Sequence, residues 1–158
     1  MMKYLLFSIS LSLGLVSCDN QSKLLREIEY RENQLTVDTL DLSQTKKDHF
    51  LLVETYEDYL KDYSETPEAA IITYKVAHYW VKMQKYGKAI QYLDLTYNNY
   101  PSLDSRVEAL LLKAFVLENK LNRKKEAKAA YQLLIKNHPD HKFAKDAKLI
   151  LENPNPLP

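Results

Sequence analysis

Cys18 is the residue with the most distinctive chemistry in this chain of 158 residues, because it is the only cysteine. A single thiol cannot form a disulfide within one chain, so the chemistry open to it is the attachment of another group to its sulfur. Cys18 stands directly after an apolar run. It is therefore either an incidental residue of that run or the point at which the chain is joined to something else.

A second group of candidate site residues is His138, Asp140 and His141 in the stretch NHPDH. Imidazole and carboxylate groups at this close spacing are metal ligands by type. The other two histidines, His49 and His78, stand alone, and no serine, cysteine or pair of carboxylates is arranged near them as a nucleophile with its base. The histidines and their neighbours therefore predict no catalytic residues. Whether NHPDH can bind a metal depends on the helices around it.

The residues before Cys18 have the layout of a secretory signal peptide. Lys3 supplies a basic start, the stretch from Tyr4 to Val16 is almost entirely apolar or small, and polar residues follow from Asp19 onward. The apolar stretch of about 13 residues is shorter than the roughly 20 residues that a membrane-crossing helix needs. We therefore expect residues 1–17 to be a signal peptide that is cleaved from the protein.

The stretch Leu15-Val16-Ser17-Cys18 resembles the bacterial lipobox, in which a leucine three positions before the cysteine directs cleavage before a lipid-modified cysteine. The resemblance implies a diacylglycerol and an N-acyl chain, such as palmitate, on Cys18. It also implies a short tether over residues 18–21, and no cofactor beyond these acyl chains. The alternative is an ordinary cleaved leader, after which the processed chain begins near Asp19.

The composition of the chain from Cys18 onward excludes several classes of protein. This part has 141 residues, with 21 basic and 21 acidic residues, and this overall balance predicts no electrostatic footprint for nucleic acid. Only Gly14 and Gly87 are glycines, which argues against a phosphate-binding loop and against a hairpin-rich β fold. We expect one all-α domain without a nucleic-acid partner.

A repeat of 37 to 38 residues runs through the body of the chain, with equivalent points at Tyr63-Ser64, Tyr100-Pro101 and His138-Pro139. The spacing around these points places recurring residues on one stripe of each helix, with small residues where two helices approach closely. His138 takes the place of Tyr63 and Tyr100, so we expect it to pack at a helix end rather than to bind a metal. The recurring residues before each point are Leu52, Tyr56 and Tyr59; Ala89, Leu93 and Thr96; and Ala127, Tyr131 and Leu134. Those after each point are Ala69, Ile72 and Ala77; Arg106, Ala109 and Ala114; and Ala144 and Ala147, with Arg106 breaking the pattern.

These spacings resemble the tetratricopeptide repeat, TPR, which consists of two antiparallel helices with a proline at the end of the second. Val76, Ala77, Trp80, Ala89 and Leu93 fall on the signature positions for Leu, Gly, Tyr, Ala and Phe when Pro101 is the terminal proline. Thr73 stands where an aromatic is usual, and the stretch ENKLNRKKEA lengthens the second repeat. The resemblance implies a right-handed superhelix of about three antiparallel helix pairs with a C-terminal capping helix over residues 22–152. A Pro-rich tail follows at residues 153–158.

The pattern predicts helices at about residues 22–35, 46–62, 67–84, 86–99, 104–120, 124–137 and 141–152, with Ser43 or Thr45 as a cap of the second helix.

The stretch AFVLENKLNRKKEAKAAYQLLIKNHPDHKFAKDAKLILEN is similar to small TPR lipoproteins of the Bacteroidota. The repeats also resemble those of the β-barrel-assembly lipoprotein and of a periplasmic cell-division coordinator. These resemblances imply a non-catalytic scaffold or adaptor that binds an envelope protein or peptide segment near the membrane. We expect a lipid anchor in the cell envelope, at the outer membrane facing the periplasm, with the inner membrane as the alternative. Two other functions remain open, an envelope hydrolase or glycan-processing enzyme and a soluble periplasmic ligand-binding protein.

The TPR resemblance also implies a binding groove, because the first helix of each pair lines the concave face of such domains. The residues that fall on this face by register are Tyr74, His78, Val81 and Lys82 in one pair, and Leu111, Phe115, Glu118 and Asn119 in the next. Tyr74 with His78, and Leu111 with Phe115, are i, i+4 pairs that each present a patch on one face. The alternative is that Leu111 and Phe115 belong to the core between helices.

Overall fold

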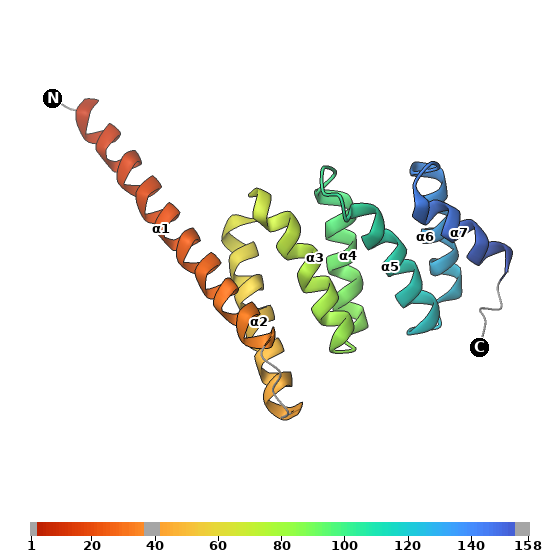
Figure 1. The fold of residues 1–158 in the computed structure, drawn as a ribbon. Coiled ribbons are helices and arrows are strands. Elements are labelled where there is room, and N and C mark those ends of the chain that lie inside the picture. Colours follow the sequence, from red (N-terminus) through yellow and green to blue (C-terminus); the bar gives the residue numbers. More distant parts are fainter. Residues whose placement is uncertain (1–2, 37–41, 154–158) are drawn as a thin grey trace. The chain divides into compact units, whose positions relative to one another are not determined.

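The structure of the protein, a computed structural model, describes residues 3–36 and 42–153, and helices are its only regular elements in these ranges (Figure 1). The helices are α1 (Lys3–Thr36), α2 (Leu42–Tyr63), α3 (Pro67–Lys82), α4 (Tyr86–Asn99), α5 (Arg106–Asn119), α6 (Lys124–Asn137) and α7 (Lys142–Glu152). The expected all-α fold with seven helices is confirmed for the described residues. The Pro-rich tail, apart from Asn153, lies outside them.

The two N-terminal helices differ most from the predicted bounds. Helix α1 continues through residues 18–21, where we expected a short tether, and α2 begins at Leu42. Ser43 and Thr45 therefore lie inside α2, and their prediction as caps is wrong, because a residue that caps a helix stands before its first helical residue. Among the residues that the structure describes, no helix combines the length and the apolar character needed to cross a membrane.

The chain divides into two compact units, unit 1 from Met1 to Thr66 and unit 2 from Pro67 to Pro158. In unit 1, α1 packs against α2, and Tyr56 and Tyr59 of α2 are fully buried as the repeat pattern predicts. Their hydroxyls have partners: Tyr59 accepts a hydrogen bond of 3.0 Å from Gln21 Nε2, and Tyr56 donates to Glu32. A buried tyrosine is stable in this way because its ring packs while its oxygen stays bonded.

In unit 2, each helix from α3 to α7 packs against the next one along the chain, and α7 also contacts α5. The small and bulky residues of the repeat form the core between these helices, as the sequence predicts. Small side chains at the contacts let neighbouring helix axes approach closely. The buried repeat residues of this unit are Ala69, Ile72, Ala77, Ala89, Leu93, Thr96, Ala109, Ala114, Ala127, Tyr131, Leu134, Ala144 and Ala147.

Two residues of unit 2 depart from the repeat pattern, and each makes contacts with neighbouring residues that hold it in place. Arg106 replaces a small residue, and its guanidinium lies over the ring of Tyr97, 4.4 Å from the centroid, and donates to the Tyr97 carbonyl at 2.6 Å. Thr73 replaces an aromatic residue. It is buried, donates to the Ala69 carbonyl at 2.7 Å, and lies 3.4 Å from the hydroxyl of Tyr100. The side chain of Thr73 and the hydroxyl of Tyr100 thus together occupy the place of the usual aromatic side chain.

The end of α3 is a Schellman cap with a glutamine at its left-handed position. Gln84 has a φ of 59°. Its N–H donates to the Val81 carbonyl at 2.9 Å, and the N–H of Lys85 donates to the Trp80 carbonyl at 2.8 Å. These bonds satisfy carbonyls that the helix end leaves without partners. Glycine is the usual residue here, because it has no Cβ to clash in the left-handed conformation, so Gln84 holds some backbone strain.

We expect Gln84→Gly to raise the free energy of unfolding by about 0.5–1 kcal/mol. It removes a left-handed strain of roughly 1–2 kcal/mol, and part of that gain is lost to the greater freedom of glycine in the unfolded chain. Urea unfolding followed by circular dichroism measures the change. Gln84→Ala keeps the Cβ and is the control. A glycine variant no more stable than the alanine variant would contradict the cap geometry.

Candidate functional site

The candidate site is an apolar pocket of about 240 Å³ built mainly on α5. We call it the α5 pocket. Helix α5 supplies four of its lining residues, while α3, α6 and α7 close the sides. The lining consists of His78 from α3, Glu108, Leu111, Leu112 and Phe115 from α5, Tyr131 from α6, and Phe143 and Ile150 from α7. All of them belong to unit 2, so the pocket is formed within one compact unit.

Three of the groove residues expected from the sequence meet at this pocket, namely His78, Leu111 and Phe115. Phe115 is 45% exposed, which is high for a phenylalanine. Leu111 is half-buried and also packs against the core cluster of α5, α6 and α7. Leu111 therefore belongs both to the core between helices and to the pocket, whereas Phe115 faces the surface.

The groove residues expected on α3 line a second, neighbouring hollow. It has a volume of about 510 Å³, and its lining is Tyr74, Lys75, His78, Tyr79, Val81 and Lys82. His78 lines both this hollow and the α5 pocket. The ring of Tyr74 stands edge-on to the imidazole of His78, with 4.5 Å between the centroids, as expected for an i, i+4 pair on one helix face.

The last two expected groove residues have other contacts. Glu118 Oε2 accepts a hydrogen bond of 3.0 Å from the hydroxyl of Tyr131, and Asn119 donates its side-chain N–H to the carbonyl of Phe115 at 3.2 Å. Neither residue lines the α5 pocket or the hollow on α3. Glu118 nevertheless acts on the pocket indirectly, because it holds the phenol of Tyr131, which is part of the lining.

Burial and the charge of Glu108 together set the ionisation of the polar groups on α3. Burial lowers the pKa of His78, while the negative charge of Glu108 opposes this shift. Burial also raises the pKa of Tyr74, and the Glu108 carboxylate raises it further. At neutral pH both side chains are therefore uncharged, and Glu108 is the one carboxylate in the pocket lining. The lining of the pocket is mostly apolar and contains one acidic group.

Sequence reasoning missed five lining residues: Glu108, Leu112, Tyr131, Phe143 and Ile150. Ile150 follows Leu112 by one repeat of 38 residues, but the register of the expected groove residues includes neither of them, because it leads from Leu111 to Leu149. Tyr131 and Phe143 are different, because they come from α6 and from the first turn of α7. Their place in the pocket depends on how these helices pack against α5, and no spacing within one helix indicates it.

The NHPDH stretch is used for packing and capping. The ring of His138 stands edge-on to that of Tyr97, with its Nε2 atom 3.2 Å from the Tyr97 hydroxyl. His141 accepts a hydrogen bond of 3.2 Å from the N–H of Phe143 and so caps the start of α7. The predicted packing role of His138 is confirmed. Within residues 3–36 and 42–153, no group of three or more His, Cys, Asp or Glu side chains is placed to hold a metal ion.

Comparison with known families identifies a repeat in this part of the chain. The tetratricopeptide repeat family matches residues 108–141, which cover α5, α6 and the turn that leads to α7. None of the curated proteins compared with the chain matches it. The protein therefore contains a tetratricopeptide repeat, and the matched segment carries four of the eight residues of the α5 pocket on one helix, with a fifth, Tyr131, on the other. Repeat arrays of this kind present concave surfaces that bind other proteins.

We expect a titration of the imidazole of His78 by nuclear magnetic resonance to give a pKa below its ordinary value of 6.5. Glu108→Gln should lower this pKa further, because the carboxylate favours the charged imidazolium. Since the pKa is lower in the folded than in the unfolded chain, stability from neutral His78 is present above pH 6.5 and declines below it.

Glu68→Gln is the matched control, because Glu68 is an exposed carboxylate in the first turn of α3 and lies outside the pocket lining. It should leave the pKa of His78 where it is. A pKa that stays constant or rises in Glu108→Gln would show that the carboxylate on α5 does not face the imidazole on α3.

Proposed function

We propose that the protein is a lipid-anchored lipoprotein of the cell envelope whose TPR unit holds a segment of a partner protein in the α5 pocket. The observation that carries this proposal is an exposed aromatic residue, Phe115, in the lining of an apolar pocket on the matched repeat. Aromatic anchors in apolar pockets are the residues that dominate binding energy at protein interfaces. The role is that of a non-catalytic scaffold or adaptor.

The size of the α5 pocket favours a protein segment over a small molecule as the bound partner. A volume of about 240 Å³ is below the roughly 300–1,000 Å³ of typical small-molecule sites. It is enough for one or two apolar side chains of a bound segment. The hollow on α3 adjoins it through His78, so a segment that lies across both would contact α3 and α5 together. The partner is then an extended or helical segment with apolar residues near its centre.

The chemistry of the lining gives little support to the hydrolase alternative. Hydrolysis of a glycan by the usual mechanism needs two carboxylates on either side of the bond, and acyl transfer needs a nucleophile beside a base. The α5 pocket has one carboxylate, Glu108, and no serine, threonine or cysteine. The only other ionisable groups in the lining are His78 and the phenol of Tyr131, which is already bonded to Glu118.

The proposed anchor would keep the protein close to the bilayer. One acyl chain gives only marginal residence in a membrane, whereas two or more hold a protein stably. Residues 18–21 are helical, and four helical residues rise about 6 Å, compared with about 14 Å for an extended tether. Cleavage before Cys18 would therefore leave a helix that starts almost directly at the lipid. The outer membrane facing the periplasm is the proposed site.

We expect Cys18→Ser to release the protein from the membrane fraction and to abolish its labelling with a radioactive fatty acid. Serine has no sulfur to carry the diacylglycerol, so the attachment is lost while the size of the side chain is almost unchanged. Fractionation and metabolic labelling of cells that produce each form measure both effects. Ser17→Ala, which changes a neighbouring residue and keeps the cysteine, is the control. Continued labelling of the Cys18→Ser form would contradict the lipobox interpretation.

We expect Phe115→Glu to abolish recovery of the partner when the protein is crosslinked in membranes and purified. The change places a charge in the lining of the apolar pocket, which should weaken binding by at least about tenfold. Mass spectrometry of the recovered proteins measures the loss.

Leu133→Glu is the matched control for this pull-down. Leu133 is a large apolar residue on α6 with 40% exposure, close to the 45% of Phe115, but it does not line the pocket. The control should recover the same partner as the unchanged protein. Equal recovery with both variants would show that the α5 pocket is not the binding site.

A further inference from the structure

The charges of the chain are divided unevenly between its two units, although they almost cancel overall. Residues 1–66 contain twelve acidic and seven basic residues, and residues 67–158 contain nine acidic and fifteen basic residues. Unit 1 therefore has a net charge of −5 and unit 2 a net charge of +6, which together give the +1 of the whole chain. Unit 2 is therefore strongly basic, although the net charge of the whole chain is close to zero.

More than half of the basic residues of unit 2 lie at one end of its helices. Because α3, α4, α5 and α6 alternate in direction and pack in sequence, the α3–α4 and α5–α6 loops lie at the same end, the lower one in Figure 1. We call residues 82–88 and 118–128 the basic edge. Its acidic residues are Glu118 and Glu126, and its eight basic residues, all exposed, are Lys82, Lys85, Lys88, Lys120, Arg123, Lys124, Lys125 and Lys128.

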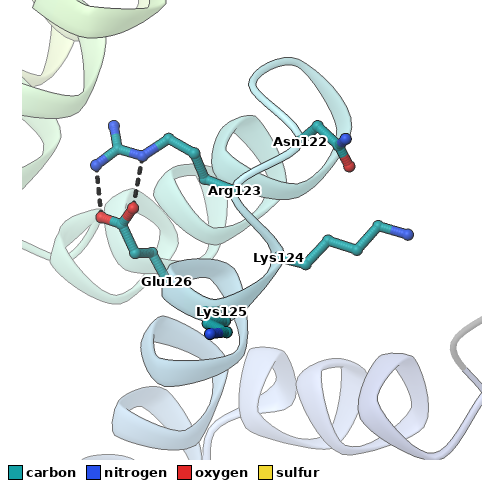
Figure 2. Close-up of a pocket in the computed structure, with 5 residues that line it drawn as sticks. All are labelled: Asn122, Arg123, Lys124, Lys125 and Glu126. Carbon is teal, nitrogen blue, oxygen red and sulfur yellow. Dashed lines mark hydrogen bonds and ion pairs between the residues drawn. The ribbon is translucent and has the colours of Figure 1, made fainter.

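The α5–α6 loop is the most strongly charged part of this edge (Figure 2). A shallow hollow of about 550 Å³ there is lined by Asn122, Arg123, Lys124, Lys125 and Glu126. Arg123 binds Glu126 through two hydrogen bonds of 2.6 and 2.5 Å, and this pairing lowers the pKa of Glu126. Lys124 points away from that pair. Glu126 thus offsets the charge of Arg123, while Lys124 and Lys125 between them in the chain are exposed.

This surface has the wrong composition for a protein interface. Such interfaces have an apolar centre and few lysines, whereas every residue of the hollow is polar or charged. Clusters of four to eight lysines and arginines instead recognise anionic lipid headgroups through long-range attraction. The charges also extend over two alternate loops, α3–α4 and α5–α6, and this spread fits an extended anionic surface better than a single anion.

We propose that the basic edge binds the phosphate headgroups of an anionic lipid bilayer. The contact is independent of the acyl chains proposed at Cys18 and would act together with them. Helices α3 to α6 run from this edge to the opposite end of unit 2, so contact through the edge would leave the α5 pocket open to the side. A partner segment could then reach the pocket while the unit rests on the membrane.

The test is vesicle flotation with the chain from residue 18 carrying Cys18→Ser, so that no acyl chain contributes. We expect binding to vesicles of phosphatidylcholine and phosphatidylglycerol in equal parts, none to phosphatidylcholine alone, and release as salt is raised. Lys124→Glu with Lys125→Glu should weaken binding by at least about tenfold. Lys145→Glu with Lys148→Glu makes the same charge change on exposed residues of α7 and should change binding by at most about twofold.

Circular dichroism and thermal unfolding establish that both double variants remain folded. Equal losses in the two variants, or equal binding to both kinds of vesicle, would overturn the proposal. Inorganic phosphate should release the protein no better than chloride at the same ionic strength, and selective release by phosphate would assign the edge to a free anion instead. Unchanged vesicle binding in the Lys124, Lys125 variant with loss of a co-purifying acidic protein would assign it to a protein partner.

Discussion

Close contact between helices through small side chains is the constraint on which the rest of unit 2 depends. Ala77 of α3, Leu93 of α4 and Ala109 of α5 form one fully buried cluster, so α4 lies between two helices that each present an alanine to it. An extra methylene in such a contact forces the helices apart and costs about 1–3 kcal/mol. The spacing of α3 and α5 that follows from this contact places His78 and Phe115 in one pocket. The core and the candidate binding surface therefore have the same origin.

Much of this arrangement could be predicted from the sequence, because the repeat of 37 to 38 residues fixes which positions face the core. Residues at equal offsets in each repeat, such as Ala89 and Ala127, are buried alike. The exceptions are positions at which a residue differs from the type that the repeat or the helix end usually requires. Arg106 keeps its place by stacking on Tyr97, and Gln84 adopts a left-handed conformation that sequence patterns reserve for glycine. Neither solution follows from periodicity alone.

Only part of the candidate site could be predicted from the sequence, because the rest depends on how several helices pack together. Register on single helices identified His78, Leu111 and Phe115, because residues one turn apart share a face. Tyr131 and Phe143 reach the same pocket from α6 and α7, and their presence depends on the packing of three helices. The basic edge shows the same limit. Its charges are visible in the sequence, but they form one surface only because alternate loops return to the same end of the unit.

The proposed scaffold function can be tested at a single position, because it requires that a partner lies against Phe115 in the intact cell. A photo-crosslinking analogue of phenylalanine at position 115 measures this directly, with the same analogue at position 133 on α6 as the comparison. A partner bound at the α5 pocket would give a discrete crosslinked product with one protein from position 115 and none of that product from position 133. No product at position 115, or the same products from both positions, would contradict this proposal.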